Sequence, residues 1–352
     1  MFETEATVFD DAPQHGPRPL PLFLSVLRSE TAASPERMTR ALAGLRAYQA
    51  APREKRLDPR PAIHRAGRAS LRNYGGEGRP VVFVPSLINL PDILDHSPES
   101  SLVQWIATQG FHAWLVDWGS PGTEDRDLDL AAHVERLLVP LLQALPEPPV
   151  LVGYCLGGTL ALGAAAITPV AGVATIAAPW HFAGYGEGRP TLAATWAAVQ
   201  PAAAMLGLLP MEILQAGFWQ LDPERTIAKY EAFADFAPDS DAARAFVRLE
   251  DWANAGAPLP YAAAASLFED CIAKDLPGKG EWTIAGTPVD PLTLACPTVE
   301  FVSLSDRIVP AATAIGVADR RDLGAGHVGM IVGRSARARL WEPLANWIAA
   351  LD

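Results

Sequence analysis

The sequence predicts an α/β fold in which a mostly parallel sheet carries helices on both faces and an inserted helical lid. Two observations predict this fold. Short apolar runs alternate with helical patterns, and one long helix-rich segment interrupts the alternation. The chain has 352 residues, of which 49% are hydrophobic and 19% are charged. This composition supports a sizeable core and is typical of a globular protein rather than a disordered one.

The alternation is defined by apolar runs that turn residues separate. Buried strands are expected over residues 81–84, 113–118, 150–153, 171–177 and 298–303, with one more short strand after residue 306. Helices are expected over residues 35–48, 101–109, 130–145, 157–166 and 336–351. Because strands and helices alternate, the strands should form a parallel sheet that is covered on both faces.

The same pattern divides the chain into an arm, a core and a lid. Residues 1–70 are rich in Pro, Arg and Ala and form an N-terminal arm. The core comprises residues 71–180 and 276–352. The intervening residues 181–275 are helix-rich and apolar, which is typical of a lid over an active site. An ordinary helical subdomain has the same pattern, so that interpretation stays open.

Composition and charge limit the partners and the cellular location that are expected. The net charge is −12 and no basic cluster stands out, so a nucleic-acid partner is not expected. The three cysteines form no CxxC pair, which favours the reduced interior of a cell. The acidic N-terminus lacks the features of a signal peptide. The charge-free residues 160–179 contain Pro169 and many Ala and Gly, which indicates a buried helix and strand rather than a membrane span.

A candidate nucleophile lies in the run Gly153-Tyr154-Cys155-Leu156-Gly157, directly between a predicted strand and a predicted helix. This is the setting of the nucleophile elbow of the α/β-hydrolase fold. The helix N-terminus favours the anionic form of Cys155, and the amide of Leu156 can donate to an oxyanion. Taken alone, the pattern also fits a buried structural cysteine.

Two later residues complete a triad in the order that this fold uses, which is nucleophile, acid and histidine. Asp306 follows the strand over residues 298–303, and His327 lies in a glycine-rich loop as the only histidine after the predicted lid. Alone, Asp306 would be a loop or capping residue and His327 a surface residue. The order Cys155, Asp306, His327 instead predicts a catalytic set.

The second oxyanion donor should come from the loop after the first core strand, over residues 84–89. The amide of Leu87 is favoured, and that of Ile88 is left open. Pro85 has no amide hydrogen and helps to fix the turn. Four other histidines show no metal-ligand spacing, so neither a metal site nor a cofactor is expected: His96, His112, His133 and His181.

These residues resemble the polyhydroxyalkanoate (PHA) synthase family over about residues 80–347. Six segments in order carry the resemblance: 85–89 with 93–95, 114–121, 153–158, 249–252 with 258–260, 305–310 and 326–329. In the third segment Cys155 replaces the serine of lipases. The chain is short, and its length is closer to the class III and IV catalytic subunits. Asp92 stands where an aromatic residue is usual, and residues 180–182 replace a segment that more often carries an acid. An altered pocket, or a paralogue with altered chemistry, is left open.

The resemblance implies an acyltransferase that polymerises 3-hydroxyacyl-CoA to a polyester through a covalent acyl group on Cys155, with release of CoA. His327 would be the base, and Asp306 would either orient His327 or activate the attacking hydroxyl. The implied partners are the growing polyester chain or its granule surface, and a second copy or a second synthase subunit. The implied location is the cytoplasm, on granules. Two alternatives stay open: an acyl-CoA thioesterase or polyester depolymerase, and a catalytically weak granule-binding protein.

Overall fold

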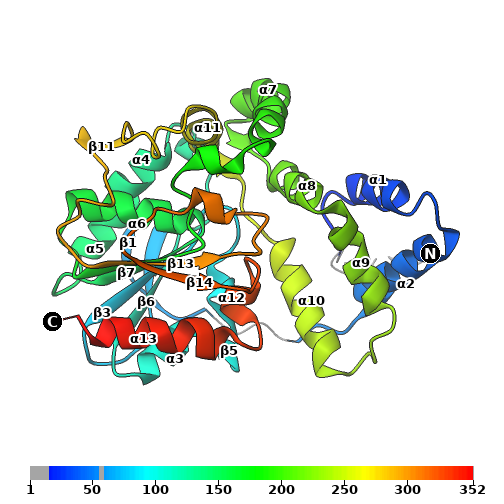
Figure 1. Ribbon diagram of the computed structural model, residues 1–352, viewed down its shortest axis with the longest axis horizontal. Coiled ribbons are helices and arrows are strands. Elements are labelled where there is room, and N and C mark those ends of the chain that lie inside the picture. Colours follow the sequence, from blue (N-terminus) through cyan, green and yellow to red (C-terminus); the bar gives the residue numbers. More distant parts are fainter. Residues whose placement is uncertain (1–15, 55–58, 352) are drawn as a thin grey trace, which may run out of the picture. The chain divides into compact units, whose positions relative to one another are not determined.

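Eight strands form one sheet in the computed structural model, which describes residues 16–54 and 59–351 (Figure 1). Their order is β1-β2-β6-β3-β7-β8-β13-β14. All neighbours from β6 to β14 are parallel, which confirms the predicted mostly parallel sheet. The strands are β1 (Ala62–Ala66), β2 (Ala69–Asn73), β3 (Pro80–Val84), β6 (His112–Asp117), β7 (Val150–Tyr154), β8 (Gly172–Ile176), β13 (Thr298–Ser303) and β14 (Asp319–Leu323).

The central strands are buried along their whole length because helices cover both faces of the sheet. Every residue of β3, β7 and β8 is buried. Helices α6 (Leu156–Ile167) and α5 (Val139–Gln143) lie on one face, and α3 (Leu102–Thr108) and α13 (Glu342–Ala349) lie on the other (Figure 1). Strands buried on both faces are continuous apolar runs, which is why the sequence predicts them well.

Strands β1 and β2 form an antiparallel hairpin at one edge of the sheet, joined through Gly67 at φ 55°. Strand β2 also pairs antiparallel with β6. Residues 1–70 are predicted to form the N-terminal arm, but in the structure all of β1 and the first residues of β2 belong to the sheet. These short strands contain polar and charged residues, so they do not produce the apolar run that marks the central strands.

The remaining elements of the chain are shorter or belong to the insertion. The other strands are β4 (Asp95–Ser97), β5 (Ser100–Ser101), β9 (Leu208–Leu209), β10 (Leu259–Pro260), β11 (Thr283–Ile284) and β12 (Thr287–Pro288). Short helices are η1 (Pro91–Ile93), η2 (Thr123–Asp125), α4 (Leu130–Ala132), η4 (Phe182–Tyr185), α11 (Tyr261–Ala265), η6 (Ala311–Thr313) and α12 (Gly329–Val332). Three π-helical stretches are η3 (His133–Leu138), η5 (Ser266–Ala273) and η7 (Arg337–Trp341).

The chain divides into two compact units. The sheet unit comprises Arg56–Gly217 and Ala255–Asp352, and the helical unit comprises Met1–Lys55 and Phe218–Asn254. The insertion predicted over residues 181–275 is helical, with α7 (Gly188–Leu206), α8 (Met211–Leu221), α9 (Pro223–Phe233) and α10 (Asp241–Ala253). Its helices fall in both units, and the bounds of arm, core and lid stay a prediction. The acidic N-terminal residues on which the signal-peptide interpretation depends lie outside the described residues.

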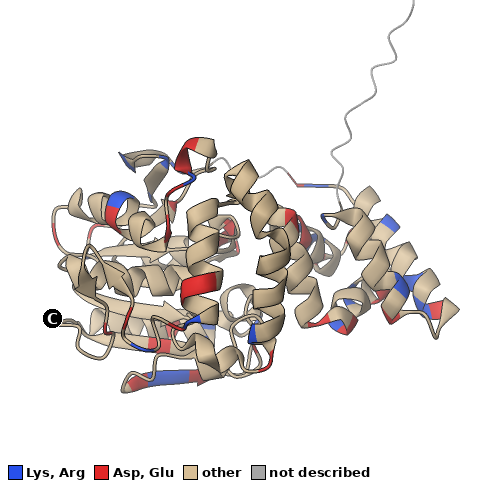
Figure 2. Cartoon of the chain, turned by 90° about the horizontal axis from the view of Figure 1, so that it is seen from above, with Lys and Arg blue, Asp and Glu red and all other residues tan. Residues whose placement is uncertain are grey.

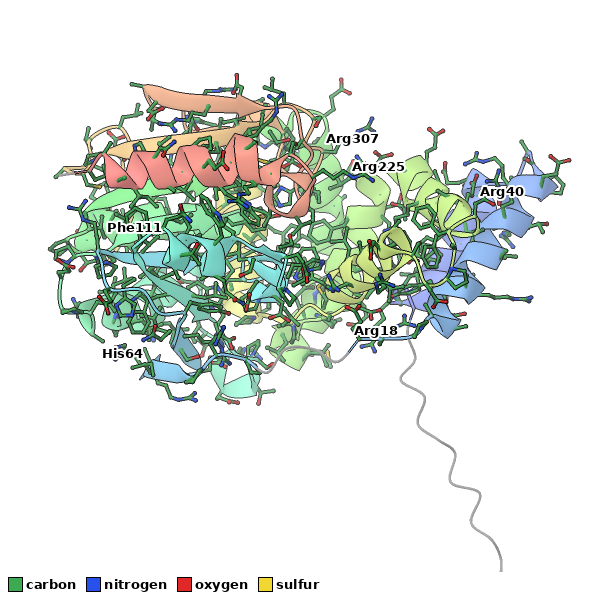
Figure 3. All side chains as sticks on the ribbon, turned by 90° about the horizontal axis from the view of Figure 1, so that it is seen from below. Arg18, Arg40, His64, Phe111, Arg225 and Arg307 are labelled. Carbon is green, nitrogen blue, oxygen red and sulfur yellow. The ribbon has the colours of Figure 1, made fainter. Side chains whose placement is uncertain are left out.

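The helical unit packs α1 (Leu20–Glu30) and α2 (Pro35–Ala50) against α9. A Cβ on Gly44 of α2 would lie 1.8 Å from the carbonyl oxygen of Tyr230, so the two helix backbones are in contact there. Lys229 and the buried Glu250 form an ion pair at 2.7 Å. Arg40 lies on the exposed side of α2, where it pairs with Asp235 (Figure 3).

Charged residues are dispersed over the described chain. In Figure 2, Lys and Arg as well as Asp and Glu are scattered over the ribbon among the other residues. Among the described residues, we find no helix with both the length and the apolar character that crossing a bilayer requires. Strand β14, the last strand in the order, carries a run of ion-paired residues: Asp319 pairs with Arg321 and Arg320 with Asp322.

Candidate active site

Cys155 occupies the turn between β7 and α6 with a backbone conformation of φ 55° and ψ −135°. Positive φ is uncommon for a residue that carries a Cβ, and such strain concentrates at functional sites. Two hydrogen bonds fix the turn. The Cys155 amide donates to the carbonyl of Ile176 at 2.9 Å, and the Gly158 amide donates to the carbonyl of Cys155 at 2.8 Å. The side chain stays partly accessible at the start of the helix.

Close backbone packing explains the glycine on the helical side of Cys155. A Cβ on Gly157 would lie 2.1 Å from the carbonyl oxygen of Val84 and 2.5 Å from that of Pro85. The first turn of α6 therefore touches the backbone of the loop that follows β3. This contact brings the amide of Leu156 and the predicted second oxyanion loop to the same end of the sheet.

Asp306 and His327 lie in the loops after β13 and β14, whose carboxyl ends meet because the two strands are parallel. Their side chains are joined by a hydrogen bond of 2.5 Å between His327 Nδ1 and Asp306 Oδ2. Asp306 Oδ1 accepts from the amides of Ile308 and Val309 at 2.7 and 3.0 Å. Both carboxylate oxygens are thus engaged, and both side chains are buried.

The charge of His327 is set by its neighbours. Burial alone lowers the pKa of this imidazole, but the negative charges of Cys155 and Asp306, and side-chain hydrogen bonds to both, raise it to about 10. The structure therefore brings together the side chains of Cys155, Asp306 and His327, as predicted from their order in the chain.

Two tyrosines outside the predicted catalytic set also lie at this site, Tyr154 and Tyr185. The Tyr154 hydroxyl donates to the backbone carbonyl of His327 at 3.4 Å, and the two rings lie 5.0 Å apart. Burial, and then the charges of Cys155 and Asp306, raise the pKa of Tyr185. Tyr185 comes from η4, which is anchored by the amide of Phe182 donating to Asp275 Oδ1 at 2.7 Å. Tyr154 was visible inside the elbow pattern, whereas no local signal marks Tyr185.

The second oxyanion donor is predicted in the loop after β3. The Ile88 amide donates to Ser86 Oγ at 3.2 Å, so it already has an acceptor. Within the described part of the chain, the Leu87 amide has no hydrogen-bond acceptor. Leu156 is the first residue of α6, where an amide has no acceptor inside the helix. Among the described residues, neither predicted donor, Leu156 nor Leu87, has its amide engaged, and their binding of an oxyanion stays a prediction.

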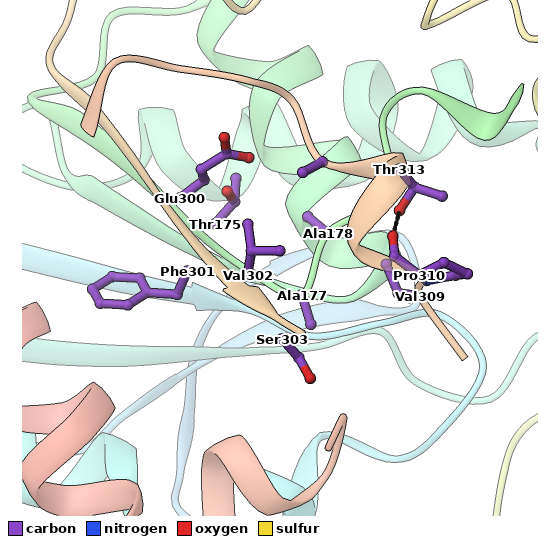
Figure 4. Close-up of a pocket in the computed structure, with 11 residues that line it drawn as sticks. Thr175, Ala177, Ala178, Glu300, Phe301, Val302, Ser303, Val309, Pro310 and Thr313 are labelled. Atoms are coloured by element: carbon purple, nitrogen blue, oxygen red, sulfur yellow. Dashed lines mark hydrogen bonds between the residues drawn. The ribbon is translucent and has the colours of Figure 1, made fainter. Parts of the chain in front are cut away.

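A small cavity lies between β8, β13 and the loop that follows Asp306 (Figure 4). Its polar lining includes Thr175, Glu300 and Thr313. Glu300 is buried and accepts from the amides of three successive residues, Ile315, Gly316 and Val317, at 2.8–3.1 Å. The carboxylate is thereby committed to holding this loop, which indicates a structural role.

The other histidines predicted not to bind metal have partners of other kinds. His133 is buried against Arg68, and the ring of His112 lies 4.5 Å from that of Trp114. His181 Nε2 lies 3.2 Å from the carbonyl of Ile315, and His96 also has an interaction partner. In residues 16–54 and 59–351, no group of three or more potential ligands could hold a metal ion.

Known proteins resemble this chain both in sequence and in fold. The model of a family described as the alpha/beta hydrolase family matches residues 81–340. Among solved structures, the chain is similar to an epoxide hydrolase from Bacillus megaterium, with a TM-score of 0.53 and 14% identity over 81% of this chain and 100% of the other. A monoacylglycerol lipase from Paleococcus ferrophilus gives a TM-score of 0.50 and 15% identity, over 81% and 99%. At these identities the likeness concerns the fold alone.

Curated relatives carry a more specific name. A poly(3-hydroxyalkanoate) polymerase subunit PhaC from Haloferax mediterranei is 26% identical, over 83% of this chain and 64% of the relative. One of the same name from Allochromatium vinosum is 25% identical, over 83% of this chain and 88% of the relative. These names confirm the resemblance seen in the motifs. The chain spans 64% and 61% of the Haloferax and Haloarcula marismortui relatives.

Proposed function

The chain belongs to the alpha/beta hydrolase family, and we propose that it is a PHA synthase that polymerises 3-hydroxyacyl-CoA with release of CoA. One observation carries the proposal: a cysteine occupies the nucleophile elbow beside a buried histidine–aspartate pair at 2.5 Å. The names of the curated relatives support the same substrate class. The reaction needs no cofactor, because the CoA thioester is itself the substrate.

The first half-reaction transfers the acyl group to Cys155. Its thiolate attacks the thioester carbonyl, and the amides of Leu156 and Leu87 hold the oxyanion that forms. The intermediate then collapses, the bond to the CoA sulfur breaks, and His327 gives its proton to the leaving thiolate. A thioester is exchanged for a thioester, so the acyl group stays activated for the next transfer.

The second half-reaction extends the chain. The hydroxyl of a 3-hydroxyacyl group attacks the acyl-cysteine while His327, now neutral, accepts its proton. A carbon–oxygen bond forms, the bond to Cys155 breaks, and the thiolate–imidazolium pair is restored. The engagement of both Asp306 oxygens favours an orienting role for this carboxylate over direct activation of the hydroxyl.

Replacing the nucleophile tests the proposal. Cys155→Ala should abolish CoA release from 3-hydroxybutyryl-CoA, measured with a thiol reagent, because no group remains to accept the acyl chain. Cys155→Ser should retain slow acylation and lose chain transfer. Cys296→Ala is the matched control, since Cys296 is also partly accessible but lies outside the site, and it should keep wild-type turnover.

The product distinguishes synthesis from hydrolysis. Insoluble polyester supports the synthase, whereas stoichiometric free 3-hydroxy acid would identify a thioesterase of the same fold. Near-normal turnover by Cys155→Ala would remove the proposed nucleophile altogether. Because the proposed product is an insoluble polyester, the proposal includes association of the protein with the granule surface. It also includes assembly with a second copy of the chain or with a second synthase subunit. Sedimentation with the polymer tests the granule association.

A further inference from the structure

We propose that Trp118 is a positioning residue for the oxyanion hole, acting through the hydrogen bond from its indole N–H to the carbonyl of Pro85. The inference rests on the proposed acyl transfer at Cys155. Trp118 directly follows β6 and is 5% exposed. Its Nε1 donates to the Pro85 oxygen at 3.0 Å. Pro85 stands two residues before Leu87, so this bond holds the peptide from which the oxyanion loop departs.

The loop is constrained from three sides, and Trp118 supplies the contact that comes from the neighbouring strand. Gly157 of α6 packs directly on the carbonyls of Val84 and Pro85. The Ser86 hydroxyl accepts a hydrogen bond from the Ile88 amide, which fixes the turn that follows Pro85. Because Pro85 has no amide hydrogen, its carbonyl is the one backbone group through which a partner can hold it. The Leu87 amide is left free.

A buried chain of hydrogen bonds fixes Trp118 in turn. Arg68 donates to the Trp118 carbonyl at 2.8 Å, and another of its nitrogens lies 2.6 Å from His133 Nε2. A guanidinium can only donate, so His133 Nε2 accepts. His133 Nδ1, 2.6 Å from the carbonyl of Asp129, then carries the proton and donates to that carbonyl. The indole is therefore attached to the protein interior at its backbone as well as at its ring.

The expected effect is specific to the transition state. When the Cys155 thiolate adds to a carbonyl, the carbon–sulfur bond forms and the π electrons move onto oxygen. The Leu87 amide stabilises that oxygen far more strongly once it is negative. Loss of the bond between Trp118 and Pro85 lets the loop shift, which weakens binding of the oxyanion and leaves binding of the ground-state substrate unchanged. The change should therefore appear in kcat and not in KM.

The chain provides a matched control in Trp114, which lies on β6, the strand that Trp118 directly follows. Trp114 is 4% exposed, and its Nε1 has no hydrogen-bond partner within the described residues. Trp118→Phe and Trp114→Phe each replace a buried indole by a phenyl ring, but only the first removes a hydrogen bond. With 3-hydroxybutyryl-CoA, Trp118→Phe should lower kcat by roughly 10- to 100-fold at unchanged KM. Trp114→Phe should leave both constants near wild type.

Two CoA analogues separate binding of the oxyanion from binding of the CoA group. A CoA trifluoromethyl ketone, in which sulfur carries CH2–CO–CF3, accepts the Cys155 thiolate and forms a tetrahedral oxyanion; S-propyl-CoA has no carbonyl. Trp118→Phe should weaken inhibition by the ketone by about tenfold or more and leave binding of S-propyl-CoA unchanged. A purely structural defect would weaken the binding of both CoA analogues, or it would lower kcat equally in Trp118→Phe and Trp114→Phe. Either result overturns the proposal.

Two further measurements separate the role of Trp118 from a folding defect and from failure of the acyl-transfer proposal. If Trp118→Phe does not fold, 3-benzothienylalanine at position 118 keeps the bicyclic shape and removes only the N–H, and the same kcat loss is expected. If the protein with 3-benzothienylalanine at position 118 shows wild-type kcat and wild-type inhibition by the ketone, the role of Trp118 is overturned. If the wild-type protein neither releases CoA nor forms the ketone adduct, the acyl-transfer proposal itself is wrong, which is a different outcome.

Discussion

Histidine side chains of this protein are driven to opposite sides of their ordinary pKa by their immediate neighbours. Burial lowers the pKa of His133 to about 4, since its partners are the cation Arg68 and a neutral carbonyl. His327 is also buried, but the negative charges of Cys155 and Asp306 raise its pKa to about 10. The same residue type is therefore a neutral acceptor in one place and a cation in the other, according to the charge of its partners.

Asp306→Asn should lower the pKa of His327, because a neutral amide replaces both the charge and the hydrogen bond that favour the imidazolium. Asn retains a carbonyl oxygen that can accept from Ile308 and Val309, so the loop should keep its conformation. Titration of the ring by NMR with labelled histidine measures the change. The wild-type ring should remain protonated at neutral pH and titrate near pH 10.

Asp129→Asn is the control for this titration. Asp129 also accepts a backbone amide, that of Ala132 at 2.7 Å, but it is not among the groups that shift His327. This variant should leave the His327 titration where it is in the wild type. A His327 pKa that is the same in Asp306→Asn and in the wild type would show that the carboxylate does not set the charge of the ring.

At the scale of secondary-structure elements, two contacts depend on the absence of a side chain. One is the approach of α6 to the loop after β3 at Gly157, and the other is the approach of α2 to α9 at Gly44. The first was predictable, because the glycines flank a cysteine between a strand and a helix. The second was not, since the partner of Gly44 is Tyr230, far along the chain, and no local pattern reports such a contact.

Gly44→Ala should destabilise the protein by about 1–3 kcal/mol, because the added Cβ would lie 1.8 Å from the Tyr230 oxygen and must push the helices apart. Urea denaturation followed by circular dichroism measures the effect. Gly217→Ala is the matched control: Gly217 is also helical, and a Cβ there meets nothing within 4 Å. That variant should be unchanged or gain roughly 0.4–1 kcal/mol. Equal stability of both variants would contradict the contact.

For the whole molecule, the sequence predicts what local patterns encode. The apolar runs of β3, β7 and β8 mark buried parallel strands, and the order Cys155, Asp306, His327 selects the site. The hairpin of β1 and β2 was not predicted, since polar residues interrupt its strands, and neither was α1. The link from His133 through Arg68 to Trp118 joins side chains from separate elements, so it becomes visible only in the fold.

The pH dependence of global stability follows from the buried His133. Its folded pKa of about 4 lies below the ordinary 6.5, so the unfolded chain binds more protons between these values. Its contribution to stability is complete above pH 6.5 and is lost as the pH falls towards 4. From pH 7 to 4.5 this histidine should remove about 2 kcal/mol from the free energy of unfolding.

His133→Gln should reduce that acid-induced loss, because an amide can donate to Asp129 and accept from Arg68 without titrating. Denaturant unfolding at pH 7 and 4.5 measures the difference. An equal loss in His133→Gln and in the wild type would assign acid sensitivity to other groups. His327 acts in the opposite direction: its contribution is lost as the pH rises from 6.5 towards 10.

The edge strand β14 affects whether copies of the protein can associate by pairing their strands. Its charges are neutralised in pairs along the strand, Asp319 with Arg321 and Arg320 with Asp322, so a foreign strand that docked there would have to disrupt and desolvate them. Self-association by strand addition is thereby discouraged. If copies of the protein gather on a polyester particle, as proposed above, this edge strand should keep them from joining into a continuous cross-molecular sheet.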